Sequence, residues 1–188
     1  MHENELLAKV ESPQALEVVE AQSVVRSALD GFDVANQRVL CIVPDSTRTC
    51  PLPAMIEVLT SEAEDASALD FIVALGTHMP MDDVALSKLV GRDVVNGEFD
   101  GHRIYNHEFD NPAELVQVGT IPASEIERLS GGRMSLDVPV TVNRHVTEYD
   151  ALIVLGPVFP HEVMGFSGGN KYYYPGCAGS EMIDTTHW

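Results

Sequence analysis

The sequence has few basic residues. Eleven lysines and arginines stand against 29 aspartates and glutamates, which gives a formal net charge of −18 at pH 7. So acidic a surface repels phosphate backbones and anionic headgroups, which argues against nucleic acid or a membrane surface as a partner. An anionic small molecule would need a local basic pocket. The scarcity of cations therefore makes Arg48 and Lys171 unusually informative.

Cysteine is also scarce, and long apolar runs are absent. Cys41, Cys50 and Cys177 are odd in number and have no C-x-x-C spacing, so we expect reduced thiols and neither a disulfide framework nor a structural zinc site. No apolar run approaches the roughly 18 residues of a membrane span. The N-terminal residues lack the basic start of a signal peptide. These absences predict a cytoplasmic protein.

Several familiar catalytic signatures are missing. The Walker A pattern G-x-x-x-x-G-K-[ST] fails because Tyr172 follows Lys171. The dinucleotide fingerprint G-x-G-x-x-G is absent, so a generic nucleotide site does not follow. The zinc motif H-E-x-x-H is also absent.

What is present is an alternation of apolar strands and helices. The sequence predicts strands at 38–43, 71–75 and 151–158 and helices at 13–29, 52–63, 82–90 and beyond 176. Between 91 and 149 it predicts strands at 103–109, 115–121 and 138–142, with helical turns at 122–129 and 145–149. Successive strand–helix units favour an α/β fold, a Rossmann-like open, mostly parallel sheet with helices on both faces.

The length of 188 residues fits one substantial domain. We expect a single α/β cofactor-binding domain over residues 1–188. The third strong strand, 151–158, has little chain after it, and the sequence stops at Trp188 within an expected helix. An enzyme of this design would be expected to continue. We therefore expect this chain to be the N-terminal part of a longer two-domain enzyme.

Polar clusters follow each of the three strong strands, at 45–49, 77–78 and 161–171. Parallel strands would bring the clusters onto one rim of the sheet, where open α/β folds bind ligands. The small-residue loop Gly165-Phe166-Ser167-Gly168-Gly169-Asn170-Lys171 leaves backbone N–H groups free to meet an anion. The rim therefore predicts a phosphate cradle with Lys171 beside it.

Simpler interpretations remain open for single residues. Ser46 and Thr47 are good helix caps, and His78 alone is more often a loop residue than a catalyst. His78, His161 and His187 together suggest a metal such as nickel, copper or zinc, although their spacing matches no familiar zinc site. Surface or structural roles are expected for the other histidines: His2, His102, His107 and His145.

In combination these residues resemble the N-terminal domain of the lactate racemase family, which uses a nickel-pincer nucleotide. The resemblance runs from about residue 38 to the end. Its motifs are Asp45-Ser46-Thr47-Arg48 with Pro51 and Pro53, Ala74-Leu75-Gly76-Thr77-His78-Met79-Pro80, His161 with the 165–171 loop, Pro175-Gly176, and His187.

The resemblance implies a cofactor, pyridinium-3-thioamide-5-thiocarboxylic acid mononucleotide, that holds Ni(II). By resemblance, the amine of Lys171 forms the thioamide tether, and His187 supplies the fourth nickel ligand. Cofactor contacts are implied for Asp45, Thr47, Ser167, Gly168 and Gly169, and Arg48 is a partner for the substrate carboxylate.

The resemblance further implies that His78 and His161 are an acid/base pair. The reaction would be racemisation or epimerisation of a small 2-hydroxy acid through hydride transfer. The implied partners are cofactor-synthesis enzymes and a missing C-terminal domain that closes the cleft. We therefore expect the isolated chain to have little or no turnover.

Two other functions remain as alternatives. The chain could be a module that binds a nucleotide or nickel cofactor without turning over a substrate. Less favoured is a zinc hydrolase built on His78, His161 and His187.

Overall fold

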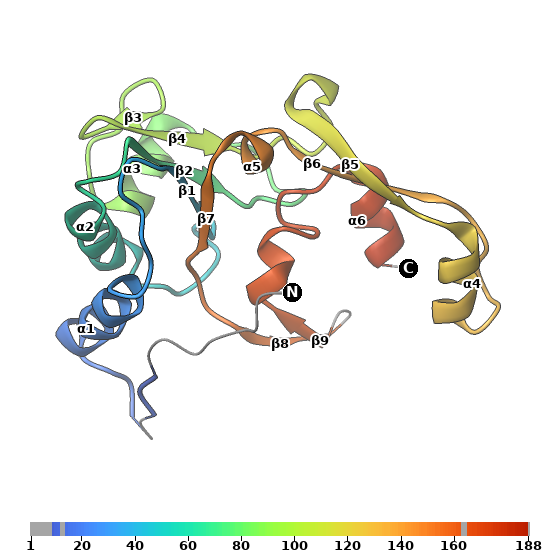
Figure 1. Ribbon diagram of the computed structural model, residues 1–188, viewed down its shortest axis with the longest axis horizontal. Coiled ribbons are helices and arrows are strands. Elements are labelled where there is room, and N and C mark those ends of the chain that lie inside the picture. Colours follow the sequence, from blue (N-terminus) through green and yellow to red (C-terminus); the bar gives the residue numbers. More distant parts are fainter. Residues whose placement is uncertain (1–8, 12–13, 163–164, 188) are drawn as a thin grey trace.

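The computed structural model describes residues 9–11, 14–162 and 165–187. Its centre is a five-stranded sheet in the order β3-β4-β2-β1-β7 (Figure 1). The strands are β1 (Arg38–Val43), β2 (Ala68–Val73), β3 (Glu98–Phe99), β4 (His102–Asn106) and β7 (Ala151–Val154). Strands β4, β2, β1 and β7 are parallel, and β3 joins the edge antiparallel. The predicted open, mostly parallel sheet is confirmed.

Strand β1 is the centre of the core. Its residues from Val39 to Val43 have no solvent exposure. Both faces of the strand are therefore covered, which explains the continuous apolar run and the absence of polar alternation.

Helices cover both faces of the sheet, as predicted. They are α1 (Val18–Leu29), α2 (Leu52–Glu62), α3 (Asp83–Val90), α5 (His145–Glu148) and the 3-10 helix η2 (Gly169–Tyr172). Apolar residues of α2 and α3 pack on one face, and α1 packs against α2. On the other face, Tyr149 and Tyr172 pack against Leu40 and Ile42. The helices on this second face, α5 and η2, are short.

A two-stranded ribbon extends away from the central sheet (Figure 1). It is formed by β5 (Leu115–Ile121), which follows the 3-10 turn η1 (Pro112–Glu114), and β6 (Val138–Asn143), with α4 (Ala123–Ser130) between them. Helix α6 (Ser180–Thr186) packs against β6. This packing fixes the last helix beside the ribbon.

The observed elements differ from the predicted ones in detail. The first helix begins at Val18, and Pro13, where the sequence predicts its start, lies outside the described residues. Strand β7 ends at Val154 instead of 158 because Gly156-Pro157 follows, and proline cannot donate to a ladder. A hairpin of β8 (Phe159–His161) and β9 (Gly165–Ser167) was not predicted. Its strands have three residues each, which is too short to show the alternation of apolar and polar residues that predicts a strand.

The cysteines are free, as expected, and Cys41 and Cys177 are buried. Over the described residues, no helix is both long and apolar enough to span a membrane.

Candidate active site

The sheet has a topological switch point between β1 and β7. The chain first runs outward from β1 through β2 to β4, and it later places β7 on the other side of β1. In open α/β sheets, ligands bind at the carboxyl ends of the strands beside such a point. A cavity of about 190 Å³ lies at this position.

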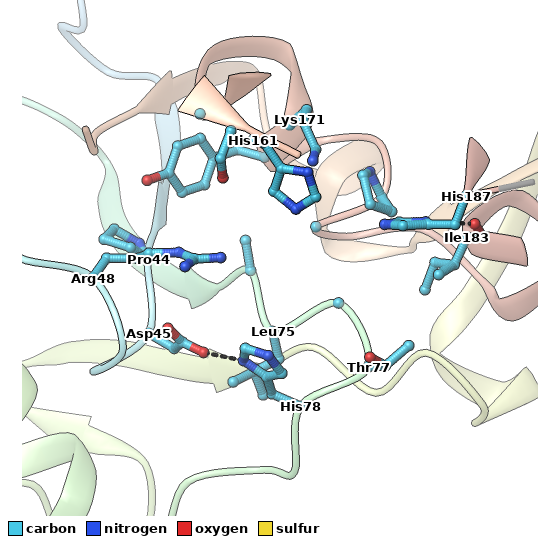
Figure 2. A pocket seen from close by; sticks show the side chains of 17 residues that line it. Pro44, Asp45, Arg48, Leu75, Thr77, His78, His161, Lys171, Ile183 and His187 are labelled. Atoms are coloured by element: carbon cyan, nitrogen blue, oxygen red, sulfur yellow. Dashed lines mark hydrogen bonds and ion pairs between the residues drawn. The ribbon is translucent and has the colours of Figure 1, made fainter. Parts of the chain in front are cut away.

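Most of the predicted site residues line this one cavity: Asp45, Arg48, His78, His161, Ser167, Gly168, Lys171 and His187. Figure 2 shows His161 and Lys171 on one side, Asp45 and His78 on the opposite side, and His187 on a third. Thr47 and Gly169 are not among the lining residues. Thr47 instead bonds to Asp45, and Gly169 begins η2.

The carboxylate of Asp45 joins two of the polar clusters. It follows β1 and is 6% exposed. One of its oxygens accepts from the Thr47 hydroxyl at 2.6 Å and from the Thr47 backbone N–H at 3.0 Å. The other is paired with Nδ1 of His78, which follows β2 (Figure 2). This pairing orients the His78 ring and leaves Nε2 as the nitrogen available to a ligand.

Two opposing effects act on the Asp45 carboxyl. Burial acts to raise its pKa, but hydrogen bonds from Thr47 and His78 outweigh burial and hold the pKa below its usual value. Asp45 is therefore a carboxylate at neutral pH.

A stability prediction follows from the lowered pKa of Asp45. A carboxyl whose pKa falls on folding contributes stability above its unfolded pKa, about 3.9, and loses it as pH falls through the folded value. Asp45→Asn should therefore be less stable than the parent chain at pH 7, with a difference that shrinks toward pH 3. Urea unfolding of both chains across this range measures the effect. A difference that stays constant with pH would contradict the assignment.

Lys171 lies on η2, after the β8–β9 hairpin. Burial lowers the pKa of its amine, and the nearby Arg48 guanidinium lowers it further, while Glu162 acts in the opposite direction. A depressed pKa raises the fraction of neutral, nucleophilic amine at a given pH. The environment of Lys171 thus suits covalent chemistry.

Gly168 shapes the loop that leads to Lys171. Its φ of +97° with ψ of −175° is a backbone conformation that is essentially confined to glycine. A Cβ at this position would lie 2.2 Å from the Pro157 carbonyl oxygen, which belongs to the backbone and cannot move cheaply. The loop is therefore pressed against the chain that follows β7.

Gly168→Ala is expected to destabilise the chain by about 1–3 kcal/mol from backbone strain, before the clash with Pro157 is added. The measurement is urea unfolding. Gly165→Ala is the matched control because Gly165 also has positive φ, +79°, but a Cβ there would meet nothing within 4 Å. A loss at Gly168 no larger than that at Gly165 would contradict the close approach.

His187 is held in an orientation that suits a metal ligand. It stands at the C-terminal end of α6, where its Nδ1 lies 2.8 Å from the Ile183 carbonyl oxygen. Because a carbonyl only accepts, Nδ1 carries the proton, and Nε2 keeps its lone pair. Metal-binding histidines commonly donate their second nitrogen in this manner.

Arg48 lies between His78 and His161, at the left of the cavity in Figure 2. Its guanidinium is 5.1 Å from the centroid of the Phe159 ring, which supports the planar group from one side. Arg48 can therefore present its edge to an anion between His78 and His161.

No three histidine, cysteine, aspartate or glutamate side chains among the described residues gather closely enough to hold a metal. His78, His161 and His187 line the same cavity from different sides. The three-histidine zinc hydrolase therefore lacks its ligand set in this part of the chain. A metal with a single protein ligand is a different case, because a cofactor would supply the other donors.

Sequence reasoning missed the bond between Asp45 and His78. It assigned Asp45 to the cofactor because of the motif around it. The bond depends on β1 and β2 being neighbours with Val43 opposite Val73, so that the loops after them leave the sheet side by side. The positions of Asp45 and His78, each just after one of two successive strands, were the feature of the sequence that could have suggested this bond.

The fold and the cavity define a class of protein: an α/β domain with a polar ligand pocket at the switch point of a parallel sheet. Residues 3–188 match the sequence model of the family described as the lactate racemase N-terminal domain. The chain belongs to this family.

Individual relatives agree with the family match. The chain is 31% identical to lactate racemase of Lactiplantibacillus plantarum and 26% identical to that of Thermoanaerobacterium thermosaccharolyticum, each over 156 residues. The aligned region is 81% of this chain but 32% of either relative. The chain thus spans about a third of the length of these enzymes.

Two solved structures have the same fold. A protein from Thermotoga maritima superposes with a TM-score of 0.80 at 30% identity, over 92% of this chain and 41% of its own. The lactate racemase apoprotein of T. thermosaccharolyticum superposes with a TM-score of 0.68 at 22% identity, over 86% of this chain and 38% of its own.

Proposed function

We propose that this chain is the cofactor-binding half of a 2-hydroxy-acid racemase or epimerase that works with a nickel-pincer nucleotide tethered to Lys171. The observation that carries the proposal is the arrangement of His78 and His161 on opposite sides of one cavity, with Lys171 and His187 beside them (Figure 2). Family membership supports the same assignment.

The residues present fit such a cofactor. Because position 168 has no side chain, its loop can pack against the Pro157 backbone, and in this position the loop lines the cavity beside Lys171. Lys171 has an amine with a lowered pKa, and His187 keeps Nε2 free for a metal. We propose that Lys171 holds the cofactor covalently, that His187 is its nickel ligand, and that Ser167, Gly168 and Gly169 lie along the nucleotide.

Each histidine would act on the substrate hydroxyl. When bound, the cofactor supplies a temporary acceptor for the hydride that leaves the α-carbon of the substrate. His78 would take the hydroxyl proton of one enantiomer, and His161 that of the other, since they face the substrate from opposite sides. The planar 2-keto acid would then regain the hydride on its α-carbon and a proton on its carbonyl oxygen, and either configuration can result because the imidazole on either side can donate that proton.

The neighbouring side chains would hold the substrate in place. Asp45 orients the His78 ring and would stabilise the imidazolium that forms during proton transfer. Arg48, supported by Phe159, would bind the substrate carboxylate between the two histidines. With the carboxylate anchored, the oxygen on the α-carbon stays within reach of both bases.

A second domain is part of the proposal. The side chain of His78 is 50% exposed, so water has access to the acid/base pair in this chain alone. Hydride and proton transfer need water excluded from the reacting atoms. The relatives' additional length would supply this cover, and we expect the 188-residue chain by itself to turn over little or no substrate.

The test is co-expression of the chain with cofactor-synthesis enzymes, followed by intact mass spectrometry and metal analysis. The proposal predicts a covalent adduct on Lys171 and about one nickel per adduct. An unmodified lysine with stoichiometric zinc would contradict it and favour a hydrolase. Proton exchange at the α-carbon of a panel of 2-hydroxy acids, measured on a two-domain version, then separates an enzyme from a carrier that binds the cofactor without turnover.

A further inference from the structure

A short junction, residues 175–179, connects the two parts of the chain that carry the proposed cofactor contacts. Before it lies η2 with Lys171, and after it α6 leads to His187. Two fully buried polar side chains from elsewhere in the fold, His107 and Asn143, contact this junction. Neither residue lines the cavity, and neither has a role in the mechanism above.

His107 is bonded directly to the junction. Its Nε2 lies 2.9 Å from the carbonyl oxygen of Ala178, which is itself fully buried. Because a carbonyl only accepts, Nε2 carries the proton. Nδ1 faces the Asn143 side-chain amide at 3.4 Å and can accept from it. Burial lowers the pKa of His107, so the ring is neutral and has one defined tautomer.

Asn143 strengthens the same attachment through its backbone and side chain. Its backbone N–H donates to the Cys177 carbonyl at 2.8 Å, and its Oδ1 accepts from the His145 N–H at 3.1 Å. Val142 also forms an antiparallel bridge with Ala178. The junction is thus fixed to the end of β6 by consecutive contacts.

The other side of the junction is bonded to the catalytic loops. The Gly176 carbonyl accepts from the N–H of Gly76, two residues before His78, at 2.9 Å. The N–H of Gly176 donates to the Lys171 carbonyl at 2.9 Å. One turn therefore sets the positions of His78, Lys171 and α6 relative to one another.

The junction sets the tilt of α6. Helix α6 starts at Ser180, directly after the junction, and its N-cap Gly179 provides no side-chain cap. A tilt of about 10° at the start of a helix moves a residue about 10 Å along it by roughly 2 Å. His187 lies at that far end. A displacement of this size would separate the histidine from a metal held by a cofactor on Lys171.

We propose that His107, supported by Asn143, is a positioning residue that sets the distance between the tether at Lys171 and the metal ligand His187. The proposal rests on the proposed function. His107 touches neither cofactor nor substrate and acts through the Ala178 carbonyl.

The test compares His107→Leu with wild type after loading by co-expression. Leucine fills the space but leaves the buried Ala178 carbonyl without its partner. The expected result is that the Lys171 adduct persists while nickel is lost to a chelator about tenfold faster, the lower end of the range for groups that orient metal ligands. His102→Leu is the control because it removes a comparable 2.8 Å histidine–carbonyl contact, to Leu69, at the opposite end of the sheet.

Rescue separates positioning from general stability. The side-chain amide of His107→Gln can reach Ala178, and this variant should retain nickel nearly as long as wild type. That of His107→Asn is one methylene shorter and should release nickel faster. Equal nickel release from His107→Leu and His102→Leu would overturn the proposal. If the leucine variant does not fold, equal release from the glutamine and asparagine variants would overturn it.

The positioning role of His107 can also be tested in chain that carries no cofactor, and therefore independently of the proposed function. In ¹⁵N-labelled chain, the backbone amide signals of α6 and His187 should shift in His107→Asn and keep their wild-type positions in His102→Leu, because a tilt of α6 changes its surroundings. Unchanged α6 signals in His107→Asn would overturn the positioning role even if the cofactor binds. If wild-type chain takes up neither adduct nor nickel, the proposed function fails, while this measurement still decides the structural coupling.

Discussion

Lys171→Met is expected to abolish covalent loading of the chain and to reduce racemisation in a two-domain version by at least 10³-fold. Methionine keeps the unbranched side chain but has no amine to form a thioamide.

Arg48→Gln should act differently from Lys171→Met, because it leaves the Lys171 amine in place and removes a cation that lowers the pKa of that amine. The measurement is the fraction of chain carrying the adduct, read by intact mass after a fixed loading time.

The pH dependence of loading provides a second observable. Only the neutral amine attacks, so the loading rate should rise with pH and level off above the lowered pKa of Lys171. In Arg48→Gln the pKa of Lys171 rises, and the same curve should shift to higher pH. Lys88→Met serves as the control because Lys88 lies outside the main cavity. Adduct formation in Lys171→Met at the wild-type level would rule out the tether.

His78→Gln and His161→Gln should each lower racemisation by about 10²–10⁴-fold, the usual contribution of a general acid–base group. Their single-turnover behaviour should differ in stereochemistry. If each imidazole serves one enantiomer, His78→Gln loses oxidation of one enantiomer to the 2-keto acid and keeps the other. His161→Gln should show the opposite preference.

The experiment mixes loaded two-domain enzyme with excess of one enantiomer and quantifies the 2-keto acid formed per active site. His145→Gln is a suitable control because His145 lies on α5, stacked on Tyr105 at 3.9 Å, and does not line the cavity. Loss of the same enantiomer in both variants would show that one histidine serves both directions. Unchanged turnover in either variant would remove that histidine from the mechanism.

The sequence predicted the sheet because its central strands are buried on both faces. Val39 to Val43 shows a continuous apolar run, and polar residues begin at Pro44-Asp45, so the strand and its ligand-binding end could both be located. Once the strands are parallel, the loops that carry His78 and Lys171 must meet at one rim. The common cavity was therefore predictable without coordinates.

Features that depend on tertiary contacts were not predictable. The β8–β9 hairpin has three-residue strands, which show no periodicity. The bond between Asp45 and His78 depends on the order of β1 and β2 in the sheet. From the sequence, His107 was expected to be a surface or structural histidine. Its neighbours in the sequence do not tell a surface histidine from a buried one, because the residues that bury and bond this imidazole are more than 30 positions away.

X-ray absorption at the nickel edge of the loaded 188-residue chain reports whether Lys171 and His187 serve the same cofactor. We expect a first shell made of the cofactor's own donors and one imidazole nitrogen, and His187→Ala should lose the nitrogen while the Lys171 adduct and the cofactor's donors remain. An unchanged nickel shell in His187→Ala would contradict the account.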